Sequence, residues 1–223
     1  MCFSATGSFA LAGVLTVLGA TSLARNSSKP HRMFAAIPLL FAVQQAAEGV
    51  VWVTLNASHS LVNGLAVRGF VGIALVVWPT WLPLALRSPE RDPKRGRALG
   101  ALSLAGGLVS SSALLLIARF PPFAQIAGHS INYEYAGSGS APARLLFLLV
   151  YLVPTVVPFF VTTLSMARVL GVVLVLSLVT AVVVQRDALT SVWCFFAAIL
   201  SGLILLALER ERRALQTRSV TEN

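Results

Sequence analysis

Residues 144–165, RLLFLLVYLVPTVVPFFVTTLS, form an apolar run in which Arg144 is the only charged side chain. A helix needs about 20 apolar residues to cross the hydrocarbon core of a bilayer, and this run has that length. Further runs of this kind precede and follow it, at 4–23, 33–55, 62–86, 98–118, 168–185 and 189–208. The pattern predicts an all-α integral membrane bundle of seven transmembrane helices. Six spans are the alternative, because the breaks near Arg168 and Arg186 are weak.

The composition indicates that most of the chain is not solvated by water. Hydrophobic residues make up 57% of the 223 positions and charged residues 11%, whereas about a quarter of the residues in a soluble domain are charged. The net charge of +9 comes from basic residues that lie between the apolar runs. Nucleic-acid binding is not expected, since it needs a continuous positive surface. We expect a multi-pass protein of the cell membrane with the lipid bilayer as its partner, and the oligomeric state is left open.

The basic residues also predict the orientation of the bundle, because short cytoplasmic loops carry an excess of arginine and lysine. Thirteen of the 17 basic residues lie in alternate connections and in the tail, and four lie at the opposite ends of the helices. This distribution places the N-terminus outside and the C-terminus in the cytoplasm. Residues 1–208 then form a single transmembrane domain with an external loop at 119–143, and residues 209–223 form a basic cytoplasmic tail.

One helical face of the span 33–55 carries several polar groups. The sequence from Gln44 to Trp52 is QQAAEGVVW, so Gln44, Glu48 and Trp52 recur every four residues and Gln45 precedes Glu48 by three. Glu48 is the only carboxylate well inside a predicted span. Such a group is costly in a bilayer unless it faces the bundle interior and has a partner. This face is therefore expected to point at protein or water.

Arg68 is the expected partner of Glu48. Glu48 lies seven residues before the outer end of its helix, and Arg68 lies six residues after the outer start of the next helix. With a rise of 1.5 Å per residue, both residues lie roughly 10 Å below the outer boundary. We expect an ion pair across the two helices, which either fixes their packing or belongs to a binding or proton-active site.

The external loop 119–143 adds ionisable and aromatic side chains to the same outer level, among them His129 and Tyr133. Its length predicts a lid or a binding loop, and a mobile connector is the alternative. By contrast, Trp78 before Pro79 and Tyr151 before Pro154 are predicted to shape the bundle rather than to catalyse. Tryptophan anchors a helix at the membrane interface, and proline kinks it.

Cofactor chemistry is weakly indicated, and the cofactor is left unknown. Cys2, Glu48 and His129 are the candidates for a metal site, because zinc accepts thiolate, carboxylate and imidazole ligands. No short ligand spacing supports such a site. Covalent retinal is excluded, since the two lysines, Lys29 and Lys94, lie in predicted loops and not in the last helix.

The opening Met-Cys-Phe-Ser-Ala-Thr-Gly-Ser-Phe, together with residues 44–52, resembles a family of uncharacterised bacterial integral membrane proteins, a domain of unknown function. Members of that family begin Met-Cys-Phe-Ser-Ala-Thr-Ala-Ser-Phe, so Gly7 replaces the more usual alanine. The resemblance implies a fold and no reaction. It draws attention to Cys2, which removal of Met1 would leave with a free α-amine as a nucleophile or metal chelate. Burial of Cys2, or a bridge to Cys194, is the alternative.

These features favour a protein that binds a small molecule or lipid in an outward-facing polar pocket in the outer half of the bundle. The predicted ligand-binding residues are Gln44, Gln45, Glu48, Trp52 and Arg68, covered by the loop with His129 and Tyr133. The first alternative is an intramembrane, metal-dependent enzyme that uses Glu48 with His129 or Cys2. The second is a structural subunit of a membrane complex. Catalytic residues are left unassigned.

Overall fold

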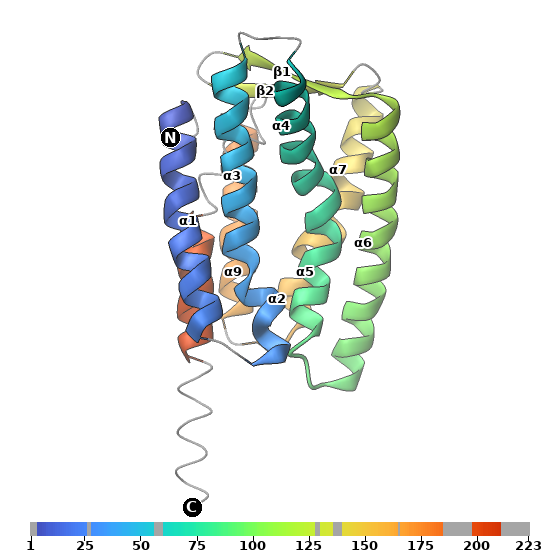
Figure 1. The fold of residues 1–223 in the computed structure, drawn as a ribbon. Coiled ribbons are helices and arrows are strands. Elements are labelled where there is room, and N and C mark those ends of the chain that lie inside the picture. The colour runs from blue at the N-terminus through green and yellow to red at the C-terminus, as the bar shows by residue number, and fades with distance from the viewer. Residues whose placement is uncertain are drawn as a thin grey trace, which may run out of the picture.

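The computed structural model describes residues 4–25, 28–55, 60–127, 130–135, 140–164, 166–184 and 198–210. Most of these residues are helical, and the long helices stand side by side as a bundle (Figure 1). In chain order the elements are α1 (Ala5–Arg25), η1 (Lys29–His31), α2 (Arg32–Ala35), α3 (Ile37–Thr54), α4 (Leu61–Gly72), the π-helix η2 (Ile73–Val77), α5 (Trp78–Arg87), α6 (Pro93–Arg119), β1 (Pro122–Ala127), β2 (Ser130–Tyr135), α7 (Ala141–Val156), α8 (Pro158–Val161) and α9 (Ala167–Val184). Residues 198–210 form a further helix.

Within the described ranges, five helical segments are long and apolar enough to cross a membrane. These segments are Ala5–Arg25, Lys29–Thr54, Leu61–Arg87, Pro93–Arg119 and Ala141–Val161, and they lie within a few residues of the first five predicted spans. The shorter helix α9 overlaps the sixth predicted span, 168–185. The helix at 198–210 overlaps the second half of the seventh predicted span, 189–208, and extends just beyond it. The prediction of a mostly helical chain with several apolar helices of membrane-spanning length is confirmed.

Three of the predicted spans are interrupted helices, and a proline stands next to each interruption. Pro38, Pro79 and Pro158 lie in the first turn of α3, α5 and α8, respectively. Proline has no backbone N–H and clashes with the preceding turn, but it fits the first turn of a new helix. The spans therefore bend at these points, and backbone carbonyls become available to side chains.

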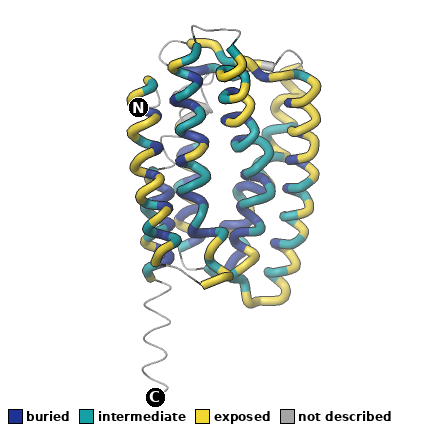
Figure 2. The backbone as a smooth tube through the Cα atoms, viewed as in Figure 1, coloured by how far each residue is buried: buried dark blue, intermediate teal, exposed yellow. Residues whose placement is uncertain are grey.

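The helices bury one side in a common apolar core. α1 packs along α3, and α5 packs against α6 and α7. Phe34, Leu86 and Leu170 are among the most deeply buried residues of this core. The outward faces remain apolar: Leu108 of α6 is 75% exposed and Leu149 of α7 is 54% exposed, and Figure 2 shows long exposed stretches on α1 and α6. Leucine faces of this kind match the hydrocarbon interior of a bilayer.

The loop at 119–143, predicted to be external, contains a β-hairpin that corrects the all-α prediction. β1 and β2 pair antiparallel, with Ile126 opposite Ile131, and lie across one end of the bundle (Figure 1). Ile131 is fully buried and belongs to a cluster with Val67 and Phe70 of α4. Tyr133 stacks on Phe70 with ring centroids 4.5 Å apart. The described part of the loop is therefore packed on the bundle, and the alternation of Ile131 and Tyr133 with polar residues was the overlooked strand signal.

At the opposite end of the bundle, the connection between α5 and α6 is tied to the residues that follow α8. The Glu90 carboxylate accepts hydrogen bonds from the hydroxyls of Thr162 at 3.0 Å and Thr163 at 2.9 Å, and from the backbone N–H of Thr163 at 2.6 Å. Arg95 donates to the carbonyl of Val161 at 2.9 Å. These bonds tie the α5–α6 connection and the first turn of α6 to the end of α8 and the residues after it.

Candidate functional site

A partly open cavity of about 220 Å³ lies between the helices of the bundle. Its walls come from α3, η2, α5, α7, α8, α9 and the helix at 198–210. Most of the lining side chains are apolar, and five are aromatic: Phe41, Trp78, Phe147, Tyr151 and Phe159. Apolar cavities of about 150 Å³ stay free of water and bind molecules the size of benzene. The cavity can therefore hold a small apolar molecule or part of a lipid chain.

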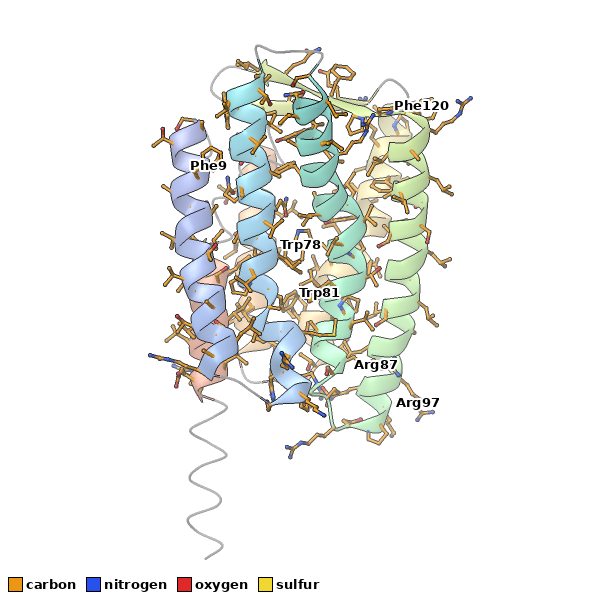
Figure 3. The ribbon with its side chains drawn as sticks, viewed as in Figure 1. Phe9, Trp78, Trp81, Arg87, Arg97 and Phe120 are labelled. Carbon is orange, nitrogen blue, oxygen red and sulfur yellow. The ribbon has the colours of Figure 1, made fainter. Side chains whose placement is uncertain are left out.

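The first polar feature of the cavity wall is a hydrogen bond between α3 and α5. The indole N–H of Trp78 donates to Oε1 of Gln44 at 2.8 Å, and Gln44 has a further interaction in addition to this bond. Phe41 packs on Trp78 with ring centroids 4.3 Å apart. Figure 3 shows Trp78 about midway along the bundle. Trp78 was predicted to anchor the helix at the interface, but it is 6% exposed and forms part of the cavity wall.

The second polar feature depends on the π-helix η2. Here the N–H of Trp78 bonds the carbonyl of Ile73, five residues earlier. In the same register the carbonyl of Ala74 would need the N–H of residue 79, which is Pro79 and has none. The hydroxyl of Tyr151 in α7 donates to this Ala74 carbonyl at 2.7 Å. Tyr151 thus supplies a hydrogen bond that the backbone of the neighbouring span cannot make.

Helix α6 supports the same stretch of η2 and α5 from another side. The Ser110 hydroxyl donates to the carbonyl of Val76 at 2.6 Å, and it forms a 2.8 Å hydrogen bond with the Thr80 hydroxyl. A Cβ atom added at Gly106 would lie 1.9 Å from the carbonyl oxygen of Pro79. A residue without a side chain is therefore required at Gly106 for the two helices to approach this closely.

The polar face of α3 is buried, as the sequence predicts. The exposed fractions of Gln44, Gln45 and Glu48 are 4%, 1% and 0%. The amide Nε2 of Gln45 donates to Oε2 of Glu48 at 2.6 Å, and Gln45 and Glu48 each have a further interaction besides this bond. Gln44 lines the cavity, whereas Gln45 and Glu48 are not among its lining residues. The predicted face is therefore divided between the cavity and a second buried environment.

The predicted ion pair between Glu48 and Arg68 is wrong. Arg68 is exposed and Glu48 is fully buried, and the only ion pair within the described ranges joins Arg25 to Glu209 at 3.2 Å. The depth estimate gave the height of the two residues but not the rotation of α4. In the structure, α4 turns apolar residues towards the bundle and places Arg68 on its exposed side.

The remaining predicted ligand-binding residues lie towards the hairpin end of the bundle or outside the described residues. Trp52 is half-buried, and its buried indole nitrogen has no hydrogen-bond partner within the described ranges. Tyr133 stacks on the end of α4 and has a further interaction. Cys2 and His129 lie outside the described residues. Among the residues that are described, no group of three His, Cys, Asp or Glu side chains could hold a metal ion.

The sequence reasoning missed three polar residues that line the cavity, Trp78, Tyr151 and Thr155. Tryptophan and tyrosine in an apolar span each bring a polar atom that needs a partner when it is buried. A nearby proline such as Pro79 removes a backbone donor and leaves a carbonyl that can be this partner. This combination was the available signal. The choice of Ala74 as acceptor depends on the π register, which the sequence does not indicate.

Comparison with known families covers almost the whole chain. Residues 1–220 match the model of a family of unknown function, DUF6629. No curated protein and no solved structure matches the chain. The family match confirms the resemblance to a family of unknown function that the first nine residues and residues 44–52 suggested. The chain therefore belongs to the DUF6629 family.

Proposed function

We propose that this protein is a seven-span protein of the cell membrane that binds a small apolar or amphiphilic molecule in the cavity beside Gln44, Trp78 and Tyr151. The ligand class, a small molecule or lipid, is the one that the sequence suggests. The proposed lining is different, because the cavity lies in the bundle interior and Gln44 alone is shared with the predicted outer pocket. The N-terminus lies outside and the basic tail in the cytoplasm.

The observation that carries the proposal is the cavity itself. Protein interiors contain few spaces larger than a water molecule, and this partly open cavity of about 220 Å³ is such a space. A ligand that fills it makes van der Waals contacts with lining side chains that otherwise have no partner atoms on that side.

The lining supports an amphiphilic ligand rather than a polar one. Aromatic and aliphatic side chains provide most of the surface, and Gln44, Trp78, Tyr151 and Thr155 provide a small polar region. Ligand sites commonly combine an apolar lining with a few placed polar groups that orient the molecule. An apolar body with one polar group therefore matches this cavity best.

Native mass spectrometry of the detergent-purified protein with para-hexylphenol as the probe tests the proposal. We expect one bound molecule per chain in the wild type and loss of binding in Ala74→Phe, because Ala74 lines the cavity. The matched control is Ala101→Phe, since Ala101 lies on the exposed side of α6, and it should bind like the wild type. Absence of binding to the wild type, or equal binding to both variants, would refute the proposal and favour a structural role.

A further inference from the structure

The polar side chains that line the cavity use most of their N–H and O–H groups in hydrogen bonds within the protein. The indole N–H of Trp78 donates to Gln44, and the hydroxyl of Tyr151 donates to the carbonyl of Ala74. The hydroxyl of Thr155 donates to the carbonyl of Tyr151 at 2.8 Å. Each of these three polar groups has a single hydrogen. None of the three can therefore donate to a ligand without breaking an internal bond.

The two hydroxyl oxygens keep their acceptor capacity. A hydroxyl that donates its hydrogen still carries two lone pairs. Tyr151 and Thr155 are four residues apart on α7, so they lie on the same side of the helix, and both line the cavity. Gln44 is engaged by Trp78 and by a further interaction. The polar part of the wall thus offers acceptors from α7, surrounded by hydrocarbon.

We infer that the ligand of this cavity is an apolar molecule with a hydroxyl group, an alcohol or a phenol, that donates to the hydroxyl oxygen of Thr155. This inference rests on the proposed function and specifies its ligand class. An ether, ketone or quinone presents only lone pairs to Trp78, Tyr151 and Thr155, whose hydrogens are engaged within the protein. Its oxygen would lose its hydrogen bonds to water and gain none from these three groups.

The test compares para-hexylphenol with its methyl ether, which has nearly the same shape but no donor. A hydrogen bond has a net value of about 1 kcal/mol, and we expect the phenol to bind about fivefold more tightly to wild-type protein in lipid nanodiscs. Thr155→Val keeps the side-chain size and removes the oxygen, so it should bind the phenol about as weakly as the ether. Thr155→Ser retains the oxygen and should keep the preference.

The outcomes separate the inference from the function on which it rests. Equal affinity of the wild type for phenol and ether would overturn the inference and leave the cavity as a binding site. If neither the phenol nor the ether binds to the wild type, the proposed function itself is overturned. A preference for the phenol that survives in Thr155→Val would overturn the assignment of the acceptor to Thr155. The thermal unfolding of each variant shows that the compared proteins are folded.

Discussion

In the wall of the cavity, the carbonyl of Ala74 accepts a hydrogen bond from the Tyr151 hydroxyl. It cannot accept one from Pro79, which has no N–H. The bond crosses from α7 to the bent span formed by α4, η2 and α5. Because a bilayer provides no water to satisfy the carbonyl, the phenol is the group that allows this span to adopt the π register.

We expect Tyr151→Phe to lower the free energy of unfolding by about 1–2 kcal/mol, because it leaves the carbonyl of Ala74 without a partner inside the bundle. Equilibrium unfolding in mixed micelles measures this loss. The control repeats the substitution in a Pro79→Ala background, where residue 79 regains an N–H. The loss should be smaller there, and an unchanged loss would show that the hydroxyl does not compensate for the proline.

The sequence indicates only part of the environment that the structure gives to the predicted site residues. Periodicity on α3 predicted that Gln44, Gln45, Glu48 and Trp52 share a face that points at protein or water, and in the structure the first three are buried and Trp52 is half-buried. It could not show that Gln44 alone would reach the cavity, since that depends on the neighbours of α3. The pairing of Glu48 with Arg68 was wrong because depth in the membrane does not determine the rotation of a helix about its axis.

Gly106 and Gly107 are consecutive residues of α6, and substitutions at the two positions test how closely α6 packs against α5. A Cβ at Gly106 would meet the Pro79 carbonyl at 1.9 Å, while a Cβ at Gly107 meets nothing within 4 Å. Gly106→Ala should therefore push α6 away from α5 and cost about 1–3 kcal/mol. Gly107→Ala should be neutral or stabilise by up to about 1 kcal/mol, because alanine favours helix. Thermal unfolding of both variants measures the difference, and equal effects would contradict the close approach.

Glu90, in the connection between α5 and α6, is expected to make the free energy of unfolding depend on pH. Desolvation alone would raise the pKa of Glu90, but hydrogen bonds from the backbone of Asp92 and from Thr163 and Thr162 lower it from the ordinary 4.5 to about 2. The folded state thus favours the ionised carboxylate. Its stabilising contribution is complete above about pH 4.5 and is lost as the pH falls towards 2.

We expect Glu90→Gln to unfold at a lower temperature than the wild type at pH 7, and the difference to narrow as the pH is lowered from 4.5 to 2. Melting curves of both proteins across this pH range measure the effect. Thr163→Val, which removes one of the hydroxyl donors, should show a smaller change in the same direction. A difference between wild type and Glu90→Gln that is independent of pH would contradict the role of the ionised form.

In the whole molecule, apolar runs in the sequence were sufficient to predict the five helical segments of membrane-spanning length in the part of the chain that the structure describes. The five longest spans agree with the sequence to within a few residues, because segment length in a bilayer is physically constrained. The cavity could not be predicted, since it lies between five stretches of chain that are distant in the sequence, namely α3, η2 with α5, α7 with α8, α9 and the helix at 198–210. The hairpin was missed because two six-residue strands give a weak signal inside a loop rich in glycine and proline.

The proposed orientation gives a direct labelling prediction. Gln125 in β1 and Ser88 after α5 are both exposed and lie at opposite ends of the bundle (Figure 1). In a chain with Cys2→Ser and Cys194→Ser, an impermeant maleimide should label Gln125→Cys in intact cells. Ser88→Cys should be labelled only after the membrane is opened. The reverse pattern would invert the topology, and labelling of both from outside would contradict a spanning bundle.

Fluorescence quenching shows directly whether the bundle binds a ligand against Trp78. In a chain with Trp52→Phe, Trp81→Phe and Trp193→Phe, Trp78 is the only tryptophan, and a brominated hexylphenol quenches an indole only at contact distance. We predict saturable quenching of Trp78 that Ala74→Phe abolishes and Ala101→Phe leaves unchanged. Weak, non-saturable quenching that is equal in all three proteins would show that the probe only dissolves in the surrounding lipid, and would contradict the account.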